Sequence, residues 1–180
     1  MIAADELFDA YFKALASSDK MLCRAYTNDK AWTSRATHAL VETGRLVMQD
    51  VEEATVAAKG HPDHYGYSEY LGIDVTWYDD RVWRGPIFIA EHENRYISQI
   101  QYAAWKLLVV EAEYRMLVAY FGDDSEVEDF EHLKRLVAET CADHSGKSIL
   151  LVGGPYGASP SSTKELIELH QTAVVGINGV

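Results

Sequence analysis

Apolar residues recur every three to four positions in several segments of the chain, which is typical of one face of an amphipathic helix. This spacing predicts helices over about residues 4–17, 31–59, 96–113 and 125–143. Gly60 directly follows the second segment and is typical of a helix end, while Gly44 offers a place for a break inside it. Ser125, with Glu128 three positions later, has the spacing of a capping box at the start of the last segment.

Two strand-like runs, 69–78 and 85–93, lie between the second and third predicted helices. Because side chains alternate between the faces of a strand, the first run predicts one apolar face, made of Leu71, Ile73, Val75 and Trp77. Asp74 falls on the opposite face. In the second run the same alternation predicts a shared face for Ile87, Ile89, Glu91 and Glu93. If the two runs pair as neighbouring strands, the carboxylates of Asp74, Glu91 and Glu93 converge.

Further strands are predicted from continuous apolar runs at 116–121 and 149–152, which are typical of strands covered on both faces. The chain after Thr163 is ambiguous: residues 164–170 fit a helix or an alternating strand, and 174–180 are more strand-like. Ser162 and Glu165 have capping-box spacing. The whole pattern predicts one α/β domain over residues 1–180, with a central mixed β-sheet flanked by helices.

The balance of charge limits the classes of function. The 180 residues carry a formal net charge of −12, which argues against a general nucleic-acid coat protein because phosphate binding relies on Lys and Arg. A nuclease is not excluded, since it needs only a local basic path.

No apolar run approaches the ~20 residues of a membrane helix. The first residues lack a secretory signal, and Cys23 and Cys141 fit no disulfide framework, so we expect a cytoplasmic protein.

Converging carboxylates favour a hard divalent cation, Mg²⁺ or Mn²⁺, because oxygen ligands suit it and the cation offsets their repulsion. A transition-metal site is a weaker alternative. His61 and His64 are closely spaced, but His92 points to the opposite strand face from Glu91 and Glu93, and the pattern is not a zinc signature.

A helix carrying Glu42, a strand containing Ile73-Asp74-Val75, a strand with Glu91-His92-Glu93 and a following αβ unit resemble the core of the PD-(D/E)XK nuclease superfamily, which includes type II restriction endonucleases. The resemblance covers about residues 34–121 and leaves an N-terminal helical and a C-terminal extension. It implies a restriction endonuclease-like fold and Mg²⁺-dependent (or Mn²⁺-dependent) hydrolysis of DNA phosphodiesters. It also implies that Asp74 and Glu91 are metal ligands, joined by Glu42 from the first core helix.

Glu93 departs from the superfamily, because it stands where the motif has lysine. A lysine from the third predicted helix could replace it: Gln99, Tyr102 and Lys106 share one helical face that could look over the carboxylates. Glu93 or Lys106 would then position the attacking water. The alternative is a nuclease-like fold without catalysis that serves as a binding or assembly module, which the missing lysine and the acidic charge favour.

The connection between the two runs and the residues just after the second run carry further candidates. Arg81, Arg84 and Arg95 flank the carboxylates in sequence and could contact phosphates. The short chain and the aromatic residues around the hairpin that the two runs would form favour a homodimer.

Overall fold

Six strands form one mixed sheet whose spatial order follows the sequence from β1 to β6. The computed structural model describes residues 2–17, 29–58, 71–79, 85–93, 96–122, 125–142, 144, 146–158 and 160–176. The strands are β1 (Ala54–Ala58), β2 (Val75–Asp79), β3 (Phe88–Glu93), β4 (Tyr114–Phe121), β5 (Ser148–Pro155) and β6 (Gln171–Gly176). β1, β2 and β3 pair antiparallel, β3, β4 and β5 pair parallel, and β6 pairs antiparallel with β5.

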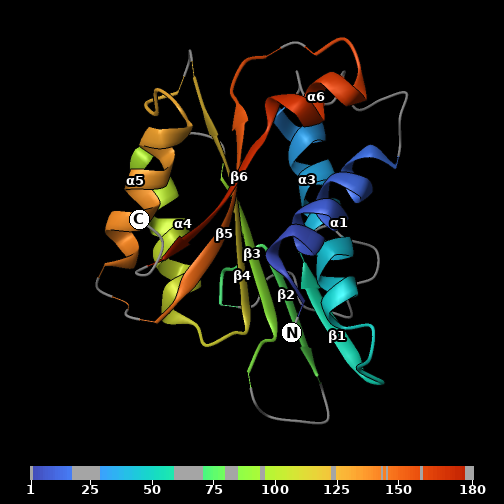
Figure 1. Cartoon of the computed structure of the whole chain (residues 1–180). Helices are drawn as coiled ribbons and strands as arrows, with labels where there is room; N and C mark the ends of the chain where they lie inside the picture. The colour runs from blue at the N-terminus through green and yellow to red at the C-terminus, as the bar shows by residue number, and fades with distance from the viewer. Residues whose placement is uncertain are drawn as a thin grey trace.

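Helices cover both faces of this sheet (Figure 1). They are α1 (Ala4–Ala16), α3 (Asp29–Val47), α4 (Ile97–Val109), α5 (Phe130–Cys141) and α6 (Thr163–Leu169). One apolar core joins α1, α3 and α6 to the sheet, and a second joins α4 and α5 to the opposite face. Successive parallel crossovers of one hand place their helices on the same side, which explains why α4 and α5 lie together. The predicted α/β class with a mixed, helix-flanked sheet is confirmed.

The second predicted helix is the largest error of the sequence pattern. Its helical part ends at Val47, and residues 54–58 form β1 instead. Small and β-branched residues fit either structure, and pairing with β2 over the whole length of β1 decides in favour of the strand. Gly44 does not break α3. A Cβ at this position would lie 2.1 Å from Cδ1 of Trp77, so the glycine allows helix and strand to pack closely.

The two predicted caps have different outcomes. α5 begins at Phe130, not near Ser125, and the side chain of Asp129 caps it by accepting from the backbone N–H of His132 at 2.7 Å. Ser162 caps α6 as predicted, because its Oγ accepts from the N–H of Glu165 at 3.2 Å. The ambiguous C-terminal segment is thus a short helix followed by β6.

Two other expectations concern membrane-spanning helices and the cysteines. In the part of the chain that the structure describes, none of the helices has the length and apolar character needed to cross a membrane. Cys141 is buried in the core between α5 and the sheet. Cys23 lies outside the described residues.

Candidate functional site

The antiparallel pairing of β2 with β3 brings the start of one strand beside the end of the other. Val75 pairs with Ala90, so Asp74, one residue before Val75, lies next to Glu91. The prediction that the two strand-like runs are neighbours is confirmed. Backbone contacts fix the two acids: Asp74 Oδ2 accepts from the N–H of His92 at 2.9 Å, and the N–H of Asp74 donates to the Glu91 carboxylate.

The chain before Asp74 is not the regular strand that the alternation predicts. Leu71 and Gly72 have φ angles of 54° and 70°, in the left-handed region, and Leu71 is 67% exposed. Ile73 joins the core beneath α4 and α5, whereas Val75 packs on the opposite face of the sheet. The predicted apolar face running from Leu71 to Trp77 is therefore wrong. A bend at Asp74 reverses the alternation and frees this side chain to approach Glu91.

Glu91 is a buried carboxyl beside a lysine. Its side chain is 4% exposed and lies on the face of β3 that α4 covers, and Nζ of Lys106 is 2.6 Å from Glu91 Oε1. Burial, and then the negative charge of Asp74, raise the pKa of Glu91 from 4.5 to about 8, although Lys106 acts in the opposite direction. Asp74, Glu91 and Lys106 thus form one coupled charged cluster.

The ion pair confirms that Lys106 lies over the strand carboxylates, whereas Gln99 and Tyr102, predicted on the same helical face, are exposed. Lys106 Nζ also donates to the carbonyl oxygen of Gly72 at 2.8 Å. Sequence patterns missed this carbonyl, because it is presented by the left-handed conformation of Leu71 and Gly72 and not by a side chain. A glycine just before a strand was the available signal.

Two cationic side chains, Arg115 at the start of β4 and Lys147 just before β5, bind the C-terminal end of α4 and so fix the position of Lys106 along the helix axis. Arg115 is buried, and it donates to the carbonyl oxygens of Leu107 at 2.8 Å and Val110 at 3.1 Å. Lys147 Nζ donates to the carbonyl of Leu108 at 2.7 Å. Cations at a helix C-terminus satisfy its last carbonyls and complement its dipole.

The residues around Glu91 on β3 alternate as predicted. Ile89 and Glu91 lie on the α4 side, and Glu93, whose side chain is half-buried, follows on that side by strand alternation. Ile87 precedes β3 and packs against the opposite core, so it does not share this face. His92 points away from the acids, as predicted: its Nε2 is 2.9 Å from the hydroxyl of Tyr120, and burial lowers its pKa to about 4.

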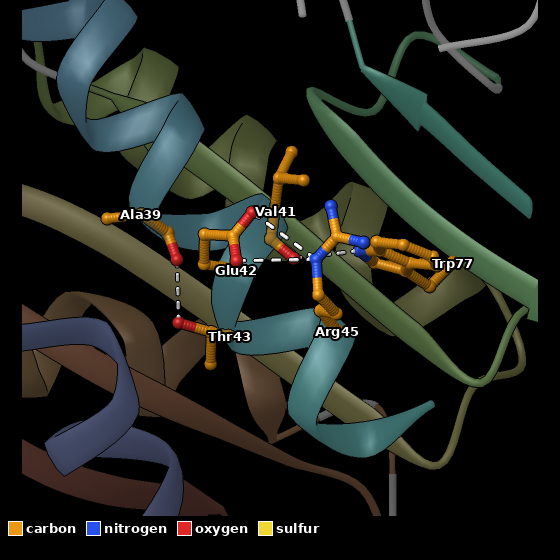
Figure 2. A network of polar contacts seen from close by, with 6 residues as sticks. All are labelled: Ala39, Val41, Glu42, Thr43, Arg45 and Trp77. Carbon is orange, nitrogen blue, oxygen red and sulfur yellow. Dashed lines mark hydrogen bonds and ion pairs between the residues drawn. The ribbon is translucent and has the colours of Figure 1, made fainter. Parts of the chain in front are cut away.

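Glu42 lies beside Arg45, close to Trp77 (Figure 2). It is on α3, which covers the opposite face of the sheet from α4, and it pairs with Arg45 at 3.3 Å. The guanidinium of Arg45 lies 5.6 Å from the Trp77 ring centroid. Trp77 pairs with Phe88, three residues before Glu91, which corresponds to about 10 Å along a strand. The structure therefore does not bring Glu42 to Asp74 and Glu91.

Several candidates cannot be placed in this site. Arg81, Arg84, Arg95, His61 and His64 lie outside the described residues. Within the described ranges, no group of three or more His, Cys, Asp or Glu side chains is arranged to hold a metal ion. The acidic part of the described cluster therefore consists of Asp74 and Glu91, with Glu93 further along the same strand face.

Comparisons with known proteins give no relative for this chain. No protein-family model matches it, no curated protein matches it, and no solved structure matches it.

Proposed function

We propose that the chain is a nuclease of the restriction endonuclease-like type that hydrolyses DNA phosphodiesters with the help of Mg²⁺ or Mn²⁺ in the cytoplasm. The observation that carries this proposal is the cluster of Asp74, Glu91 and Lys106, in which two carboxyls and an ammonium meet where β2 begins and β3 ends. A buried acid with a strongly raised pKa next to a specific charged partner is typical of functional sites.

The donor set fits a divalent cation held by Asp74 and Glu91. Burial, and then repulsion by Asp74, raise the pKa of Glu91, and the repulsion falls when a cation lies between the two carboxylates. Mg²⁺ in phosphoryl-transfer sites is commonly bound through one or two carboxylates, with water and phosphate oxygens completing its shell, so two acids are sufficient. When bound, the cation would lower the pKa of a coordinated water and offset charge on the phosphate.

Lys106 supplies the ammonium group of the proposed site. Its ammonium has three N–H donors. One is directed to Gly72 and another lies against Glu91, which leaves one for a phosphate oxygen or for the attacking water. Its side chain is 16% exposed, and the hydrogen bond of its ammonium to Gly72 is open to solvent, so a phosphate could reach it. Glu93, on the same side of β3, would orient the water, and Lys106 would take the place of the lysine that the PD-(D/E)XK motif has at Glu93.

Mg²⁺-dependent cleavage tests this proposal. The wild-type chain should cleave labelled DNA with Mg²⁺ and lose the activity in a chelator. Asp74→Ala should abolish cleavage, and Lys106→Met should reduce it by about a hundredfold or more, the usual contribution of a group that moves or positions a proton. Glu131→Gln is a matched control, because this acid is paired with Lys134 on the exposed side of α5. Unchanged cleavage by Asp74→Ala would reject the assignment.

A second candidate is a nuclease-like fold that binds without cutting. The 2.6 Å contact between Lys106 Nζ and Glu91 Oε1 favours it, since the ammonium already lies against the carboxyl where a cation would otherwise lie. The net charge of −12 also weakens binding to nucleic acid. Thermal unfolding with Mn²⁺ or Mg²⁺ separates the two candidates: a nuclease site gains stability from the cation by mass action, whereas a metal-free module does not.

A further inference from the structure

Helix α4 exposes two aromatic side chains on its outer side. Tyr102 is 58% exposed and Trp105 is 45% exposed, and their rings stack with centroids 5.7 Å apart and planes 19° apart. The inner side of the same helix is fully apolar and packs on the sheet. The two rings therefore lie outside the core, although burying an aromatic side chain is among the largest gains available to a fold.

This aromatic pair continues directly from the charged cluster. Lys106 Nζ is 5.3 Å from the centroid of the Tyr102 ring and 2.6 Å from Glu91 Oε1. A continuous series of contacts thus runs from Glu91 through Lys106 and Tyr102 to Trp105. A molecule with a phosphate at Lys106 would have its adjoining groups over flat aromatic rings.

The described part of α4 offers few exposed large apolar residues for a protein interface. Along α4 the exposed large apolar residues are Tyr96, Tyr102, Trp105 and Val109, and polar Ser98 and Gln99 are exposed among them. A specific dimer usually buries about 800 Å² on each partner. The flat, stacked rings suit a nucleobase better, because every base has a π-face and stacking on aromatic side chains is tolerant of sequence.

Base stacking also offsets the weak electrostatic attraction between DNA and this acidic chain. With a net charge of −12, affinity for DNA from Lys and Arg is limited. Base stacking contributes without adding cations, typically about tenfold in affinity or more for each base. In a duplex the faces of the bases are already stacked, so only an unpaired nucleotide can use the surface without first leaving the stack.

We propose that Tyr102 and Trp105 form a stacking platform for an unpaired nucleobase of single-stranded DNA, next to the phosphate that lies at Asp74, Glu91 and Lys106. The platform selects single-stranded DNA, or DNA with unpaired nucleotides beside the scissile bond, over regular duplex. This inference rests on the proposed nuclease function, whose substrate class it names.

Equilibrium binding without metal tests the platform separately from catalysis. The probes are a single-stranded oligodeoxynucleotide, its duplex, and the same strand with an abasic site at successive positions. Wild-type chain should bind the single strand more tightly than the duplex, with quenching of tryptophan fluorescence. Trp105→Ala and Tyr102→Ala should each weaken binding by about tenfold. Their dependence on salt should stay that of the wild type, because neither variant removes a phosphate contact.

Two controls show that the loss is specific to stacking. Trp105→Phe should recover most of the affinity, and Leu169→Ala, which removes an exposed apolar side chain from α6, should change nothing. At one position of the strand, an abasic site should weaken binding to wild type as much as Trp105→Ala does. The same abasic strand should bind Trp105→Ala no more weakly than the intact strand does. In cleavage assays Trp105→Ala should raise KM and leave kcat near the wild-type value.

The outcomes separate this inference from the nuclease proposal. Mg²⁺-dependent cleavage with equal binding by wild type and Trp105→Ala, or a preference for duplex, overturns the platform alone. Binding that depends on Trp105 without any cleavage keeps the platform and rejects the nuclease. Failure of wild type to bind single-stranded DNA overturns the platform. So does self-association that Trp105→Ala abolishes, since the surface would then belong to a second copy of the chain.

Discussion

Glu91→Gln offers the sharpest test of the charged cluster, because it removes one ionisable group and nearly preserves its size. The Glu91 side chain is 4% exposed, and burial together with Asp74 raises its pKa from 4.5 to about 8. The folded chain therefore holds this proton more strongly than the unfolded chain does. Ionisation of Glu91 must then destabilise the fold.

The size and direction of the effect follow from the pKa shift. Below about pH 4.5 the group is protonated in both states, and its full contribution to stability is present. As the pH rises from there to about 8, the unfolded chain loses the proton while the folded chain keeps it, so the free energy of unfolding falls. Above that range both states are ionised and no further loss occurs. Each pKa unit corresponds to about 1.4 kcal/mol, so the total is about 3–5 kcal/mol.

Urea unfolding without divalent cations, at several values between about pH 5 and about pH 9, measures this contribution. The free energy of unfolding of wild type minus that of Glu91→Gln should fall by several kcal/mol across the range. Glu131→Gln should follow the pH dependence of wild type, because it leaves Glu91 in place. Parallel curves for wild type and Glu91→Gln would refute the reasoning, since they would mean that Glu91 titrates as a solvated acid.

Three further predictions follow from the same contacts. At about pH 7 Glu91 holds its proton, so binding of Mg²⁺ should release close to one proton in wild type and none in Glu91→Gln, as measured by calorimetry in buffers of different ionisation enthalpy. Arg115→Met should lower the free energy of unfolding in urea by about 2–4 kcal/mol, because two carbonyls at the end of α4 lose a charged donor. Gly44→Ala should lower the free energy of unfolding by about 1–3 kcal/mol, because the new Cβ would displace Trp77. An unchanged urea midpoint would contradict this prediction, since it would mean that α3 and β2 move apart without cost.

The strands that carry the acids could be predicted because their signal is local. Alternation along β3 gave the correct sides for Glu91, Glu93 and His92, since every residue from Phe88 to Glu93 pairs with β4 in unbroken register. The same rule failed before β2. There the left-handed conformation of Leu71 and Gly72 and the bend at Asp74 break the alternation, and neither can be derived from apolar spacing.

Contacts between segments far apart in the sequence could not be predicted from the apolar spacing. Helical spacing placed Lys106 on the correct side of its helix, but the ion pair with Glu91 depends on how α4 crosses from β3 to β4. Glu42 shows the opposite case. Its position on a helix was correctly predicted, yet tertiary packing decides which face of the sheet α3 covers. On that face Glu42 pairs with Arg45, one turn further along the same helix. For β1, only the partner strand distinguishes strand from helix.

The rate of Mg²⁺-dependent cleavage of single-stranded DNA by wild type and by Asp74→Asn tests the central claim most directly. Asparagine keeps an oxygen that can accept from the N–H of His92, so the variant should fold as wild type does while its site loses one negative charge. We predict chelator-sensitive cleavage by wild type and none by Asp74→Asn of equal thermal stability. Equal cleavage by the two proteins, or none by a wild-type chain saturated with Mg²⁺, would contradict the account.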